Sequence, residues 1–175
     1  MNSIFIGMIF IFLDFNLTFN NVIVGLIPDF IGYIYIYKGA KELSVYSERF
    51  EETYTYIVVM GIYSAVVYLL RLTGITASLG MPITYILNLI VCIMSLVISY
   101  KIVQGIADIE IVTSSELNYE KLNSSWKILA VFSIAACVLS IIPGINIFCA
   151  IVSFVAGVYY LFVFNTSKRL FNENL

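Results

Sequence analysis

The sequence predicts an all-α, polytopic integral membrane protein, a single bundle over residues 1–175 with six helical segments and both termini in the cytoplasm. Hydrophobic residues make up 61% of the chain and charged residues only 11%, against roughly a quarter charged in soluble proteins. The apolar residues form continuous blocks instead of alternating, which favours helices over a barrel in lipid. Lysine and arginine also gather on one side of the predicted bundle.

Four blocks are long enough to cross a bilayer core of roughly 30 Å, which takes about 17 to 20 helical residues. These predicted spans are Tyr54–Leu72, Met81–Lys101, Trp126–Ile142 and Ile145–Phe164. They form the third to sixth helical segments.

The N-terminal region is predicted to hold the two shorter segments, Ile4–Leu13 and Val22–Tyr37. One helix over both would be about 50 Å long and would enclose the polar stretch DFNLTFNN and Pro28, which a helix interior does not tolerate. The two segments therefore form either a hairpin of short tilted helices or a re-entrant pair. No Lys or Arg precedes the first apolar run, so we expect it to be retained and not cleaved as a signal peptide.

The distribution of positive charge sets the predicted orientation, because short loops rich in Lys and Arg stay in the cytoplasm. With six segments and both termini inside, only Arg71 of the nine positive residues falls on the outer side. The other eight lie in or beside the inner loops and in the C-terminal tail: Lys38, Lys41, Arg49, Lys101, Lys121, Lys127, Lys168 and Arg169.

The connections carry signals for helix ends. Each outer connection has one proline, at Pro28, Pro82 or Pro143, and proline suits the first turn of a helix. The inner connections, residues 43–54 and 119–126, have apolar residues at helical spacing and either lie on the inner membrane face or extend the spans. Thr113-x-x-Glu116 has the form of a capping box that would start the later helix.

The candidate ligand-binding residues follow from the outer charges, Asp14, Asp29 and Arg71. A carboxylate at Asp29 suits the first turn of a helix, and we expect it to pair with Arg71. The pair either fastens the second segment to the third or forms the floor of an outward-facing pocket, with Tyr85 as an aromatic wall. The residues proposed to bind a ligand there are Asp29, Arg71, Tyr33, Tyr68 and Asn88.

Several functions lack support in the sequence. The chain has no histidine, no HExxH and no Gly-rich phosphate loop, so we expect no enzyme, no metal site and no cofactor. The net charge of −2 is scattered, which argues against nucleic-acid binding. We expect Cys92, Cys137 and Cys149 to be small buried apolar residues, since no C-x-x-C spacing joins them.

One polar stripe runs along the fourth segment at a helical spacing of three and four residues. Such a stripe is typical of hydrogen bonds between helices inside a membrane bundle. Its members are Tyr85, Asn88, Cys92, Ser95 and Ser99.

The segment LIPDFIGYIYIYKG, after a short apolar helix and NLTFNN, resembles a pattern in uncharacterised multi-pass membrane proteins of clostridia and related Firmicutes. This resemblance covers about the first 50 residues, implies a bacterial plasma membrane and implies no activity. In size and helix number the chain is also similar to the substrate-binding S components of energy-coupling factor transporters. That likeness implies an outward-facing pocket and concerns the fold alone.

Two functional hypotheses follow. The first is a small-solute binding or transport subunit, whose partners are the lipid bilayer, the solute and other membrane subunits. It predicts a cavity between the second, third and fourth segments. The second is a non-catalytic membrane partner protein, such as a regulator, an immunity protein or an assembly factor. It predicts that replacing Asp29 or Arg71 alters stability and not ligand binding.

Overall fold

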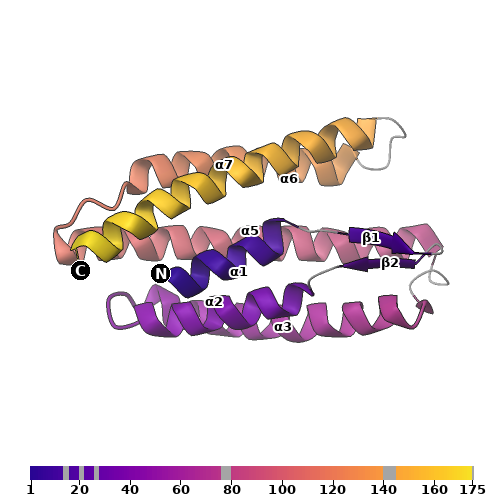
Figure 1. Ribbon diagram of the computed structural model, residues 1–175, viewed down its shortest axis with the longest axis horizontal. Coiled ribbons are helices and arrows are strands. Elements are labelled where there is room, and N and C mark those ends of the chain that lie inside the picture. Colours follow the sequence, from indigo (N-terminus) through magenta and orange to yellow (C-terminus); the bar gives the residue numbers. More distant parts are fainter. Residues whose placement is uncertain (14–15, 20–21, 26–27, 76–79, 140–144, 175) are drawn as a thin grey trace.

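The computed structural model describes residues 1–13, 16–19, 22–25, 28–75, 80–139 and 145–174. These residues form six helices and one two-stranded β-hairpin. The helices run nearly parallel to one long axis, and both termini lie at the same end (Figure 1). The elements are α1 (Asn2–Phe12), β1 (Asn16–Phe19), β2 (Val22–Gly25), α2 (Asp29–Leu43), α3 (Arg49–Leu72), α5 (Gly80–Thr113), α6 (Tyr119–Leu139) and α7 (Ile145–Asn174).

Four of these helices, α3, α5, α6 and α7, are long and apolar enough to cross a membrane. This confirms the four long predicted spans. Two of them continue well past the predicted boundaries at the end that holds the termini, α5 to Thr113 and α7 to Asn174. The second inner stretch belongs to α6, which starts at Tyr119. Of the first, residues 49–54 belong to α3, which starts at Arg49, and residues 44–48 form the turn between α2 and α3.

The N-terminal region differs from the all-helical prediction. α1 covers Asn2–Phe12, and Val22–Gly25 is a strand, where a helix over Val22–Tyr37 was predicted. It pairs antiparallel with Asn16–Phe19, with Phe19 opposite Val22 and Asn16 opposite Gly25. β-branched and aromatic residues on both strands favour this pairing, and the stretch is too short to form a stable separate helix. α1 and α2, which precede and follow this hairpin in the sequence, pack against each other.

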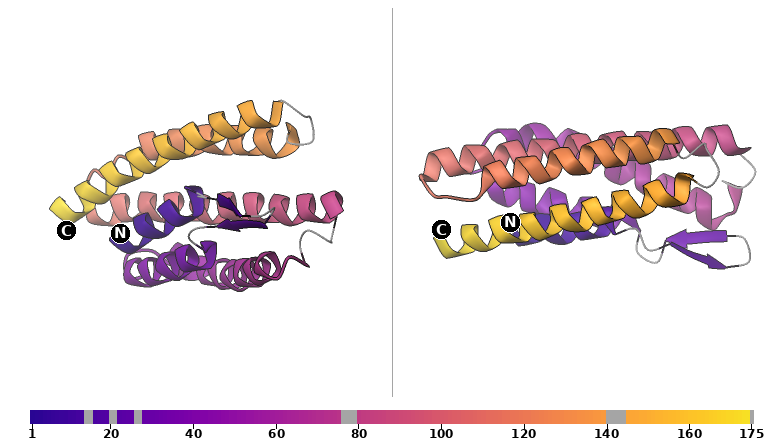
Figure 2. Two further views of the ribbon diagram at one scale, coloured as in Figure 1. Left: turned by 45° about the vertical axis from the view of Figure 1, so that its right-hand side comes forward. Right: turned by 90° about the horizontal axis from the view of Figure 1, so that it is seen from above.

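Each helix packs against its neighbours in sequence, and α7 packs against α1, so the contacts among the six helices close a ring. The long helices run roughly in one direction in both further views (Figure 2). α1 and α2 approach each other closely at glycines. A Cβ atom at Gly7 would lie 2.5 Å from the carbonyl oxygen of Gly32, and one at Gly32 would lie 2.8 Å from that of Gly7.

The buried core occupies the half of the bundle next to the termini. Ile102, Val103 and Ile106 of α5 and Phe164 of α7 are fully buried. At the other end of the same helices, apolar side chains are widely exposed to the surroundings: Ile83, Ile86 and Ile90 of α5, and Ile147, Phe148 and Ile151 of α7. The packing between helices therefore weakens from the terminal end towards the end that holds Arg71.

The start of α6 is capped differently from the prediction. The proposed capping box fails because Thr113 still belongs to α5 and Glu116 precedes the first residue of α6. The carboxylate of Glu110 instead accepts hydrogen bonds from the backbone N–H groups of Leu117, at 2.9 Å, and Tyr119, at 3.1 Å. A carboxylate at this place satisfies backbone donors that the helix itself leaves unpaired.

The prolines lie near helix starts, as predicted, where the structure describes them. Pro28 is the N-cap of α2, and Pro82 is the third residue of α5. Pro143 and Asp14 lie outside the described residues.

Candidate functional site

The five residues predicted to bind a ligand all lie on α2, α3 or α5, towards the end opposite the termini. The Arg71 guanidinium donates a hydrogen bond of 3.2 Å from Nη2 to Oδ1 of Asn88, which joins α3 to α5. Sequence reasoning placed both residues in one site, and the structure brings them together. The ion pair of Arg71 with Asp29 stays a prediction.

Two of the other predicted residues, Tyr33 and Tyr68, belong to the contact between α2 and α3. Tyr33 is buried, with 1% of its surface exposed, and its Cβ faces Gly61 of α3. Among the described residues its phenol oxygen has no hydrogen-bond partner. The ring of Tyr68 meets that of Phe30 edge to face, with centroids 5.9 Å apart, so it packs beside the first turn of α2, where Asp29 lies.

We expect the contact between Arg71 and Asn88 to stabilise the fold modestly. In a double-mutant cycle of Arg71→Ala and Asn88→Ala, the interaction free energy should be about 0.6 kcal/mol, because hydrogen bonds between membrane helices are weak on average. The measurement is equilibrium unfolding in mixed micelles. Strict additivity of the two substitutions would show that this hydrogen bond contributes nothing to stability.

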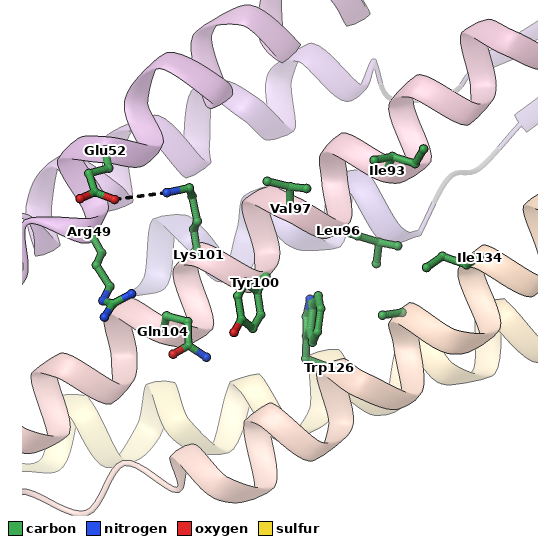
Figure 3. A pocket seen from close by; sticks show the side chains of 11 residues that line it. Arg49, Glu52, Ile93, Leu96, Val97, Tyr100, Lys101, Gln104, Trp126 and Ile134 are labelled. Atoms are coloured by element: carbon green, nitrogen blue, oxygen red, sulfur yellow. Dashed lines mark hydrogen bonds and ion pairs between the residues drawn. The ribbon is translucent and has the colours of Figure 1, made fainter.

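A pocket lies elsewhere, between α3, α5 and α6, in the half of the bundle nearer the termini (Figure 3). It has a volume of about 390 Å³, within the range of small-molecule sites. None of the five predicted residues lines it. Its lining comprises Arg49 and Glu52 of α3, Ile93, Leu96, Val97, Tyr100, Lys101 and Gln104 of α5, and Trp126, Ala130 and Ile134 of α6.

One end of this pocket is polar. Lys101 pairs with Glu52 at 3.2 Å, and its Nζ lies 5.3 Å from the ring centre of Tyr56. Gln104 donates from Nε2 to the hydroxyl of Tyr119 at 3.2 Å. Glu52, Lys101, Gln104 and Arg49 gather at one end of the space (Figure 3). Ile93 and Ile134 lie at the other end (Figure 3).

Arg49 is fixed through only part of its guanidinium. Its Nε donates to Oδ2 of Asp108 at 2.8 Å, and the same oxygen accepts a 2.6 Å hydrogen bond from the Ser47 hydroxyl. Among the described residues, neither Nη group has a hydrogen bond, and the Arg49 side chain lies next to Gln104 at the polar end of the pocket (Figure 3). A planar guanidinium with open donors can bind a carboxylate or phosphate.

Two aromatic rings form the middle of the pocket wall. The rings of Tyr100 and Trp126 lie 4.6 Å apart between centroids and are tilted by 42°. The indole Nε1 of Trp126 donates a 3.0 Å hydrogen bond to the hydroxyl of Ser99. Trp126 is the one tryptophan of the chain, so its fluorescence reports directly on this site.

The polar stripe of α5 has the role predicted for it at several positions. Tyr85 donates to the carbonyl of Cys137 at 3.1 Å, and Cys92 donates to the carbonyl of Ser133 at 3.8 Å. These bonds and the one to Ser99 link α5 to α6. The three cysteines are thiols and half-buried, so they are less buried than the small buried apolar residues that were predicted.

The chain matches no family model, and no curated protein or solved structure matches it. No group of three or more His, Cys, Asp or Glu residues that could hold a metal ion occurs within the described ranges. The arrangement of charged, aromatic and aliphatic side chains is therefore the basis on which a function can be proposed.

Proposed function

We propose that the chain is a bacterial plasma-membrane protein, with both termini in the cytoplasm, that binds an amphipathic solute as a non-catalytic binding or transport subunit. The observation that carries this proposal is the pocket between α3, α5 and α6, which is polar at one end and aliphatic at the other. The sequence predicted an outward-facing pocket between the second, third and fourth segments, whereas the site proposed here lies between α3, α5 and α6.

The position of the pocket along the membrane-spanning helices supports an amphipathic ligand. Its polar end includes Arg49 and Lys101, which belong to the set of eight positive residues that orientation by charge assigns to the cytoplasmic interface. Its aliphatic end, at Ile93 and Ile134, lies further along α5 and α6, towards the centre of the spans. A ligand with a polar head at the interface and a chain in the hydrocarbon region fits both ends.

The open donors of the lining favour a head group that accepts hydrogen bonds, such as a carboxylate. The lining holds two positive residues, Arg49 and Lys101, and one negative residue, Glu52. Asp108, beside the lining, pairs with Arg49. Lys101 is already paired with Glu52, which leaves the Nη donors of Arg49 for the head group. A carboxylate with an alkyl chain is the simplest molecule of this kind.

The test uses the fluorescence of Trp126 with the protein in nanodiscs. A fatty acid brominated on its chain should quench this fluorescence saturably, and the matching brominated alcohol should do so far more weakly. Arg49→Met should weaken binding of the acid about tenfold, the effect of losing roughly 1.4 kcal/mol.

Lys121→Met is the matched control, because Lys121 is an exposed cation on the same side of the bundle, outside the lining. It should leave binding of the acid unchanged. Equal, unsaturable quenching by acid and alcohol would contradict the proposal. Quenching by a phospholipid with brominated chains and one negative charge is measured in the same way, to distinguish a free fatty acid from a membrane lipid as the ligand.

A second function, that of a non-catalytic partner of other membrane subunits, is favoured by a separate observation. In the most apolar 18-residue stretch of each long helix, only 22 to 39% is buried inside the bundle. The outer residues Arg71, Asn88 and Tyr68 contact neighbouring helices, which supports a structural role for them, as this hypothesis predicts. Association of the purified protein with a second membrane protein, unaffected by Arg49→Met, would favour this function over solute binding.

A further inference from the structure

Two cysteines that are 45 positions apart in the sequence meet across the contact between α5 and α6. The side chains of Cys92 and Cys137 lie within hydrogen-bonding reach of each other. The thiol of Cys92 also donates to the carbonyl oxygen of Ser133 at 3.8 Å, and Ser133 lies one turn before Cys137 on α6. Both observations place the Cys92 sulfur against the face of α6 that carries Cys137.

The backbone around this pair is held in place by other contacts. The hydroxyl of Tyr85 in α5 donates to the carbonyl oxygen of Cys137 itself, at 3.1 Å. One turn away on α6, the hydroxyl of Ser133 lies 3.2 Å from that of Ser153 in α7. The two thiols therefore face each other from helices whose register is set by independent hydrogen bonds.

Two thiols within hydrogen-bonding reach of each other are close to the geometry of a disulfide. A disulfide needs the sulfur atoms to approach to about 2.05 Å, with the Cβ atoms about 3.5 to 4.5 Å apart, and rotation of one or both side chains can bring sulfurs in contact to that distance. Both cysteines are half-buried on apolar helices, so a reagent dissolved in the lipid can reach them.

We propose that Cys92 and Cys137 form a reversible dithiol–disulfide site that links α5 to α6 and that a lipid-soluble quinone oxidises. Two S–H bonds break and one S–S bond forms. The two electrons and two protons released pass to the quinone, which becomes a quinol. A small dithiol reductant reverses the reaction by thiol–disulfide exchange.

The link would join the two helices next to the pocket, since Ile93 and Ile134 lie one and three positions from Cys92 and Cys137. It would fix the distance between α5 and α6 at this level. Formation of this disulfide depends on the two thiols alone and does not require the pocket to bind a solute.

The test counts reactive thiols by the gel shift that a maleimide-linked polymer gives after the protein is denatured. The protein in nanodiscs is incubated with an alkylated benzoquinone whose ring positions are all substituted, so that thiols cannot add to the ring. The wild type has three cysteines and should retain one reactive thiol, with three restored by a dithiol reductant. The oxidised protein should remain monomeric on a non-reducing gel.

Three variants identify the partners. After quinone treatment, the Cys149→Ser variant should lose both of its reactive thiols, because Cys92 and Cys137 are both present. The Cys92→Ser and Cys137→Ser variants should each keep two reactive thiols. Three reactive thiols in the treated wild type, loss of thiols in Cys92→Ser or Cys137→Ser, or a disulfide-linked dimer would each overturn the proposal.

Discussion

Replacing Gly7 by alanine is expected to lower the free energy of unfolding by about 2 kcal/mol. The new methyl group would lie 2.5 Å from the carbonyl oxygen of Gly32, a backbone atom that cannot rotate away. Overpacking of this kind costs about 1 to 3 kcal/mol and sometimes more, whereas alanine gains only about 1 kcal/mol over glycine in helix propensity. α1 and α2 must therefore separate, which loosens the contact between them.

The measurement is equilibrium unfolding in mixed micelles, followed by Trp126 fluorescence and circular dichroism. Gly157→Ala is the matched control, because a Cβ atom at Gly157 would meet its nearest neighbour only at 3.8 Å. That variant should be as stable as the wild type or slightly more stable. Equal stability of the Gly7→Ala and Gly157→Ala variants would contradict the close approach of α1 and α2.

Replacing Asp108 by alanine is also expected to cost about 2 kcal/mol. One carboxylate oxygen holds both the Ser47 hydroxyl and Arg49, and so joins the connection between α2 and α3 to α5. A hydrogen bond to a charged group contributes about 1.5 to 3 kcal/mol, and Ser47, only 8% exposed, would lose its acceptor. The side chain of Arg49 is 51% exposed, so the ion pair itself adds little.

Two further substitutions separate these contributions in the same unfolding measurement. Asp108→Asn keeps an acceptor for Ser47 and should lose about half as much stability as the alanine variant. Glu173→Ala removes an exposed ion pair with Arg169, whose atoms are 3.7 Å apart, and should change stability by less than about 0.5 kcal/mol. An Asp108→Ala variant no less stable than the Glu173→Ala variant would show that this junction does not stabilise the fold.

The long helices could be predicted because their signal is local. An unbroken apolar run of about 20 residues has few alternatives in lipid, and α3, α5, α6 and α7 follow from it directly. The hairpin at Asn16–Gly25 was missed because its apolar residues suit a strand as well as a helix over such a short run. The cap of α6 was also missed, since Glu110 reaches Leu117 and Tyr119 across a loop that no sequence template describes.

The pocket was missed for a different reason. Sequence reasoning searched for rare charges at the outer side and found Asp29 and Arg71, whereas the pocket uses Arg49 and Lys101, which the orientation argument had already explained. Only Trp126, the single tryptophan, marked the region as unusual. The meeting of Cys92 with Cys137 depends on the relative register of α5 and α6, which hydropathy does not determine.

The uneven packing along the helices has a consequence for the surrounding bilayer. Near the termini, α5 and α7 are enclosed by protein, as Ile102 and Phe164 show. Near Arg71, side chains such as Ile86 and Phe148 are exposed, where the acyl chains of a surrounding membrane would contact them. We therefore expect the thickness and fluidity of the leaflet at the Arg71 end to influence how closely α5, α6 and α7 approach one another.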